Sequence, residues 1–99
     1  MFPRLLLTLR KHFGMPELCR FLGIVIFMNF NDYNPPHFHA KYGDFEVTIE
    51  IESGIVEGKF PKRAMNLVIE WYELHKEELL ENWILMSTTG EFHKIKPLE

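Results

Sequence analysis

The chain has 99 residues, which leaves room for one small domain and excludes a second one. Its composition, with 46% hydrophobic and 25% charged residues, is typical of a soluble globular protein and excludes a disordered or collagen-like chain. The aromatic content of 14% supplies enough bulky core material to make disulfides or a structural metal unnecessary for stability. We expect residues 15–99 to form a single domain and residues 1–14 to form an N-terminal extension.

The net charge of −3 is unevenly distributed along the chain. Residues 1–43 carry five basic and two acidic groups, a formal +3, whereas residues 44–99 carry six basic and twelve acidic groups, a formal −6. Proteins that bind the backbone of nucleic acids usually display a basic stripe, and this sequence has none. Charge therefore does not support a nucleic-acid partner, and the acidic second half suits a basic protein partner better.

Cysteine usage and the apolar runs indicate where the protein works. The single cysteine, Cys19, excludes an intramolecular disulfide and a cysteine-based zinc site, which favours a reducing compartment. The longest apolar runs are far shorter than the ~20 residues that span a bilayer. The N-terminus also lacks the small-residue cleavage site of a signal peptide. We expect a cytoplasmic protein with no membrane-spanning segment.

The first half of the chain contains a predicted helix, a predicted strand and a predicted loop. Apolar residues at helical spacing predict a short amphipathic helix over residues 3–13, which Gly14 would end. The nearly continuous apolar run over residues 21–30 predicts one central buried strand. The segment from Asn29 to Pro36 is rich in Asn, Asp and Pro, and it predicts a stiff loop.

The middle of the chain has the pattern of a small antiparallel sheet. Alternating apolar and polar residues predict strands over residues 37–42 and 45–51, joined by a turn at Gly43. Residues 53–57 predict a second turn and a short returning strand, which Gly58 would end.

The C-terminal third predicts one long helix. Pro61 suits a first turn, and apolar residues then recur every three or four positions, with a bend near Glu77 and an end at residues 87–90. Residues 91–95 would add an edge strand. The predicted fold class is therefore α+β, with a small antiparallel sheet of three to five strands packed against one long C-terminal helix and a short N-terminal amphipathic helix.

The candidate site lies in the predicted loop and the strand after it. His37 and His39 are two positions apart, so on a strand both imidazoles leave the same face, and Asp32 lies one loop upstream. Two imidazoles and a carboxylate are ligands that zinc, nickel, copper and iron accept, with positions left open for a substrate. The sequence thus makes Asp32, His37 and His39 both the candidate catalytic residues and the candidate ligands of a divalent transition metal.

Other interpretations of the same residues remain open. Without a metal, His37 and His39 could share proton transfer as an acid–base pair. Alternatively, they could only end a rigid turn, with one ring bonded to a backbone carbonyl and the other exposed. Tyr33 could stack a base, but an aromatic residue in such a loop more often anchors the loop to the core. His75, on the apolar side of the predicted helix, is expected to be a satisfied core or interface histidine.

Several runs of this sequence resemble a prokaryotic family of unknown function that has a Pro-Pro-His-Phe-His-Ala core. The resemblance covers residues 15–98 and is carried by residues 30–43, 61–64, 70–71, 74–75 and 77–83. It implies a small accessory-genome protein encoded beside a second small protein, as the toxin half of a toxin–antitoxin pair. Many relatives have His where this chain has Tyr33 and a basic residue where it has Phe27, so a three-imidazole site is not implied here.

Three functional hypotheses follow. The first is a toxin component that acts through the Asp32–His39 loop and is neutralised by a small antitoxin-type protein encoded nearby. The others are a non-enzymatic protein-binding module and a small metal-dependent enzyme. The predicted partner-binding residues on the acidic side of the long helix are Glu73, Glu77 and Glu81. A homodimer through Leu5, Leu6 and Leu9 is the alternative assembly.

Overall fold

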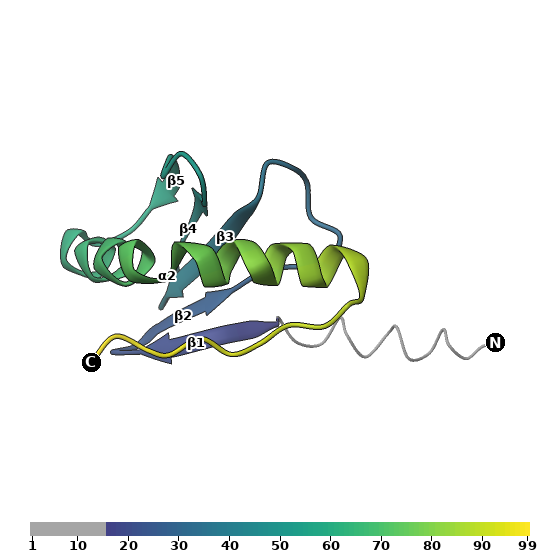
Figure 1. The fold of residues 1–99 in the computed structure, drawn as a ribbon. Coiled ribbons are helices and arrows are strands. Elements are labelled where there is room, and N and C mark those ends of the chain that lie inside the picture. The colour runs from purple at the N-terminus through teal and green to yellow at the C-terminus, as the bar shows by residue number, and fades with distance from the viewer. Residues whose placement is uncertain (1–15) are drawn as a thin grey trace.

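The computed structural model describes residues 16–99, which form an antiparallel sheet with one long helix lying across it (Figure 1). The strands follow one another in the sheet in chain order, each antiparallel to the next. The elements are β1 (Glu17–Phe21), β2 (Ile24–Phe27), β3 (His37–Tyr42), β4 (Phe45–Glu50), β5 (Val56–Lys59) and α2 (Lys62–Thr88). The α+β class and the long C-terminal helix are confirmed, whereas the helix predicted over residues 3–13 lies outside the described residues.

The prediction of a single strand over residues 21–30 is wrong, because the chain folds back within it. β1 ends at Phe21 and β2 begins at Ile24. Between them Leu22 and Gly23 have positive φ angles of 50° and 83°, which an extended strand cannot contain. Leu22 is 68% exposed. Continuous apolar character therefore did not identify a single strand here, because Leu22 within the run lies in a solvent-exposed turn.

The hairpin of β3 and β4 is confirmed, and the next strand extends further than predicted. Gly58 does not end β5 but pairs with Val47 of β4. Its φ angle is 112°, and a Cβ atom at this position would lie 2.5 Å from the carbonyl oxygen of Glu46. A glycine is thus required where the two backbones come this close.

The two faces of β3 and β4 have different environments. Phe38, Ala40, Val47 and Ile49 are buried in the core that also contains Val68, Trp71 and Leu79 of α2. His37 pairs with Glu50, and His39 pairs with Thr48. Because side chains alternate along a strand, these paired polar residues share the opposite face. The site residues therefore project from the side of the sheet that does not form the core.

The long helix begins directly after Pro61 and is broken at His75, two residues before the predicted bend. His75 has φ and ψ angles of −127° and 23°, outside the helical region. Its ring lies 5.2 Å from that of Trp71 and is hydrogen-bonded to Glu78, as expected for a satisfied histidine. No helix within residues 16–99 is both long and apolar enough to cross a membrane.

Residues 91–95 do not form the predicted edge strand, although they lie beside β1 (Figure 1). The buried Asn82 side chain bonds both backbone groups of His93, at 2.9 and 2.7 Å. Further along, Trp71 Nε1 donates to the carbonyl of Lys96, and the Ile95 amide donates to that of Leu18. Side chains of the helix and one backbone hydrogen bond to β1 thus hold this segment in place. They replace the row of backbone hydrogen bonds that the predicted edge strand would make.

The single cysteine provides a test of this fold. Cys19 is 4% exposed in β1, and burial raises the pKa of its thiol to about 11. Since the thiolate is the reactive form, the folded chain should contain roughly 100-fold less of it than an unperturbed cysteine at the same pH. A thiol reagent at about pH 8 should therefore label Cys19 only as urea unfolds the chain. Rapid and complete labelling without urea would contradict this placement of β1.

Candidate functional site

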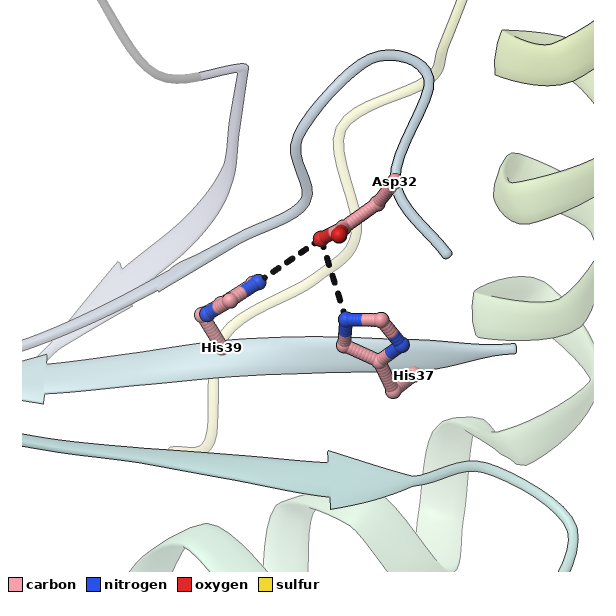
Figure 2. Close-up of side chains that lie close together, drawn as sticks. All are labelled: Asp32, His37 and His39. Carbon is pink, nitrogen blue, oxygen red and sulfur yellow. Dashed lines mark hydrogen bonds and ion pairs between the residues drawn. The ribbon is translucent and has the colours of Figure 1, made fainter. Parts of the chain in front are cut away.

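Asp32, His37 and His39 converge on one point at the start of β3 (Figure 2). Asp32 Oδ2 lies 3.0 Å from His37 Nε2 and 3.1 Å from His39 Nε2. One potential ligand atom from each of the three residues lies within 4.8 Å of the other two. The structure therefore brings together all three residues that the sequence singled out.

The loop before β3 positions the aspartate. Asn31 adopts a positive φ angle of 58°, which asparagine tolerates better than most residues. The Tyr33 amide then donates to Asp32 Oδ1 at 2.9 Å. The end of the loop is fixed to the sheet, because the Ile51 amide donates to the carbonyl of Pro36. One carboxylate oxygen is therefore bonded within the loop, and the other is left facing the histidines.

Both imidazoles are oriented by an acceptor at Nδ1, the ring nitrogen that does not face Asp32. His37 Nδ1 lies 2.9 Å from the Pro35 carbonyl oxygen, and His39 Nδ1 lies 3.3 Å from Glu46 Oε2. Each ring thus has an acceptor for an N–H at Nδ1 and the Asp32 carboxylate at Nε2. In the tautomer that is protonated on Nδ1, the lone pair is on Nε2, the atom that faces Asp32 in both residues.

Aromatic rings cover the two histidines. The His39 ring stacks on Phe27 with centroids 4.8 Å apart and an interplanar angle of 12°. The His37 ring lies 5.2 Å from that of Trp83, from the second half of α2. The side chains of His37 and His39 are only 15% and 11% exposed. The structural hypothesis in which one ring is exposed is therefore wrong, although the bond from His37 to a backbone carbonyl is present.

The carboxyl group of Asp32 is stabilised in its ionised form. Partial burial alone would raise its pKa, but hydrogen bonds from His39 and the Tyr33 amide, together with neighbouring His37, outweigh this effect. The net result is a pKa lowered below its ordinary value. Asp32 therefore supplies a negative charge to the centre of the site at neutral pH.

The arrangement matches the ligand set of a divalent transition metal. Such ions hold imidazole nitrogen and carboxylate oxygen at about 2.0–2.2 Å, so adjacent ligand atoms are about 2.8–3.6 Å apart, from octahedral to tetrahedral angles. The two observed separations from Asp32 Oδ2, 3.0 and 3.1 Å, fall within this range. Two imidazoles and one carboxylate leave further coordination positions open.

A cavity of ≈ 340 Å³ lies beside the three residues. The histidines and Asp32 form part of its wall, and no Lys or Arg within residues 16–99 lines it. Its remaining lining residues are Tyr33, Asn34, Pro35, Thr48, Glu50, Ile55 and Glu57. Tyr33 is 84% exposed at this cavity, so the expectation that it anchors the loop to the core is wrong.

A family model described as a domain of unknown function, DUF4160, matches residues 23–84. This chain belongs to the DUF4160 family. The match is narrower than the expected 15–98, but it includes the three converging residues and all the residues of the cavity wall. No curated protein and no solved structure matches the chain.

The predicted partner-binding residues of this DUF4160 chain do not belong to the site. Glu73, Glu77 and Glu81 are exposed on α2, and none of them lines the cavity. Glu73 pairs with Lys76 at 3.7 Å. A basic partner along this side of the helix therefore stays a prediction.

Sequence reasoning missed Glu46, Phe27 and Trp83. Glu46 could have been found from the predicted hairpin, because a turn at Gly43 pairs residue 41 with residue 46 and places Glu46 diagonally from His39. Phe27 was noted only as a position where many relatives have a basic residue, and nothing connected it with His39. No local signal connects Trp83 with His37, because the contact depends on how α2 crosses the sheet.

The lowered pKa of Asp32 predicts how the free energy of unfolding depends on this residue and on pH. Asp32→Asn should lower the free energy of unfolding near neutral pH by about 1–3 kcal/mol, because hydrogen bonds to a partly buried charge are lost. A carboxyl whose pKa is lowered by folding stabilises the protein above its unfolded pKa, and this contribution disappears as the pH falls through the folded pKa. The difference between wild type and variant should therefore shrink from about pH 5 to pH 2.

Urea unfolding in the presence of a chelator measures this difference. Asp44→Asn is the matched control, because Asp44 is exposed in the turn between β3 and β4. A stability difference for Asp32→Asn that stays constant over the whole pH range would contradict the assignment.

Proposed function

We propose that this DUF4160 chain is a small metal-dependent enzyme that binds a divalent transition metal through Asp32, His37 and His39. One observation carries the proposal. Both histidines direct Nδ1 at a fixed acceptor and Nε2 at the same carboxylate oxygen. Histidines that bind metals characteristically donate their second ring N–H to a carbonyl or carboxylate in this way.

The same geometry disfavours metal-free acid–base chemistry. Two unprotonated Nε2 atoms would place their lone pairs against Asp32 Oδ2, so without a cation each contact needs a proton on Nε2. An Nε2 that donates this proton to Asp32 presents no lone pair as a general base. A shared cation instead uses both lone pairs at once.

The Asn29 side chain can donate to His39 when the lone pair of this ring is on Nε2. Its amide Nδ2 lies 3.3 Å from His39 Nε2. An amide N–H donates to this ring nitrogen only when the nitrogen carries no proton. A lone pair on His39 Nε2 is also what a metal requires.

The surroundings suit catalysis better than simple ion storage. A divalent ion bound by three protein ligands lowers the pKa of a bound water molecule and polarises substrate oxygens. Pro35 and Glu46 fix the rings, whereas Phe27 and Trp83 restrict the access of solvent to them. The cavity gives a small molecule or side chain access from the other direction.

Metal titration tests the proposal. The full chain, treated with chelator and then dialysed, should bind one Zn²⁺ or Ni²⁺ ion in the micromolar range or tighter, about −8 kcal/mol, by calorimetry. His37→Ala, His39→Ala and Asp32→Ala should each weaken binding by at least about tenfold, since each removes one ligand. His93→Ala, on an exposed histidine outside the site, is the matched control and should bind as wild type does.

Tryptophan fluorescence provides a second readout at the site itself. Because Trp83 lies against His37, Ni²⁺ should quench its emission, and Trp83→Phe should abolish this quenching. Trp71→Phe should retain it, since Trp71 packs in the core against Phe38. Binding weaker than about 1 mM, or equal binding by the His37→Ala variant, would refute the metal centre.

A toxin acting through residues 32–39 would use this same site, so the toxin hypothesis concerns the biological role of the chemistry. The non-enzymatic binding module is its rival, because it would use the histidines only to shape the loop. Growth after induced expression in a bacterial host distinguishes the two. A toxin should arrest growth, and the His37→Gln and His39→Gln double variant should relieve the arrest.

Folding must be checked in that experiment, because both rings are largely buried and contribute to packing. Circular dichroism of the purified double variant provides this check, and His93→Gln is the control for expression level. Arrest by the folded double variant would place any toxicity elsewhere in the chain. The absence of arrest with the wild-type chain would favour the binding module.

A further inference from the structure

The cavity beside the three proposed ligands has an acidic wall. Asp32, Glu50 and Glu57 contribute three carboxylates, and among the residues that the structure describes no Lys or Arg lines the cavity. A divalent cation held by Asp32 and the histidines would leave this lining with a formal net charge of about −1, made up of +1 at the metal and Asp32 and −2 at Glu50 and Glu57. An anionic substrate would therefore meet repulsion on the side of the cavity away from the metal ligands.

The strand register places the two glutamates on the face that carries the histidines. Glu50 pairs with His37, one strand spacing away, and Thr48 pairs with both His39 and Glu57. Adjacent strands are about 4.8 Å apart, so the backbone of Glu57 lies roughly 10 Å from that of His39. The carboxylate of Glu57 thus lies far enough from the metal ligands to receive a second group of the same substrate, whereas Glu50 lies between it and His37.

The two glutamates differ in their bonding. Glu50 Oε1 accepts a hydrogen bond from the Ser53 hydroxyl at 2.7 Å, which orients its carboxylate. The Glu57 side chain is exposed and makes no hydrogen bond or ion pair with another residue of the described part of the chain. Lys41 and Lys59 also belong to this face of the described strands. Both are cross-strand neighbours of Glu46, two positions further along the strands, and neither lines the cavity.

Apolar surface accompanies the acidic wall. Tyr33, Pro35 and Ile55 also line the cavity, and both Tyr33 and Ile55 are exposed. Such side chains can cover a hydrocarbon stem while a charged end group lies at the glutamates. The wall therefore matches a group that combines an alkyl chain with a positive end.

We infer that the site takes a substrate bearing an ammonium or guanidinium group on an alkyl stem, which Glu50 and Glu57 receive. A lysine or arginine side chain of a protein and a free polyamine share this chemistry. The inference rests on the proposed function for the reaction at the metal ligands. It also disfavours phosphodiesters, because their negative charge would have to enter beside two glutamates.

Binding of small cationic probes tests the inference. The Zn²⁺-loaded full chain should bind Nα-acetyl-lysine methylamide or spermidine with a dissociation constant of about 1 mM or tighter, measured by NMR shifts of the Thr48 and Glu57 amides. Tighter binding of the first probe identifies a protein side chain as the source, and tighter binding of the second identifies a free polyamine. The Nε-acetylated lysine probe and inorganic phosphate should both bind at least about fivefold more weakly.

Variants locate the interaction on the wall. Glu57→Gln should weaken amine binding by about two- to fivefold, the range for one partly exposed charge pair, and Glu50→Gln with Glu57→Gln should weaken it further. Glu70→Gln removes the same charge from an exposed position on α2 outside the cavity and should change nothing. Equal binding of the acetylated probe, or wild-type affinity in the double variant, would overturn the inference.

The two proposals can fail separately. If Zn²⁺ binds but neither amine does, the substrate class is wrong and the metal centre stands. If the amines bind the chelator-treated chain while Zn²⁺ does not bind, the acidic wall is a cation site and the proposed metal-dependent function is wrong.

Discussion

One carboxylate oxygen, Oδ2 of Asp32, determines the arrangement of the whole site. Two imidazole nitrogens lie within 3.1 Å of it, and together they connect the loop after β2 to the first half of β3. A partly buried carboxylate is costly unless its hydrogen-bonding capacity is satisfied, and here the Tyr33 amide occupies the second oxygen. The loop conformation, the ring orientations and the negative charge of the site therefore depend on the same few contacts.

Strand β3 connects this site to the core. Its residues alternate, so that Phe38 and Ala40 pack beneath α2 while His37 and His39 project from the other face. A shift of register by one residue would bury two imidazoles in the core and expose a phenylalanine. The hydrophobic core thus fixes the register of β3 and, with it, the direction of both histidines.

The sequence predicted the parts of the structure that depend on local signals. Alternation over residues 37–51 and the helical periodicity after Pro61 gave β3, β4 and α2, and the His-x-His spacing with Asp32 nearby gave the three converging residues. It did not predict the β1–β2 hairpin, because Leu22 in a turn with positive φ has no recognisable sequence signal. The sequence also wrongly predicted that Gly58 ends the strand. The glycine is explained by its close approach to the backbone of the paired strand, which only the structure reveals.

The same distinction between local and distant contacts explains how the site is built. The three converging residues come from eight consecutive positions, 32–39, so little chain entropy is lost in bringing them together beyond that of the stiff loop itself. Glu46 and Trp83, which orient or cover the rings, come from β4 and from the far half of α2. A local segment therefore supplies the reactive groups, while the completed fold aligns them and limits their contact with water. Only when the sheet and helix have packed does His39 acquire a fixed ring orientation and His37 its aromatic cover. The chemistry of the site therefore depends on the folded domain and not on the motif alone.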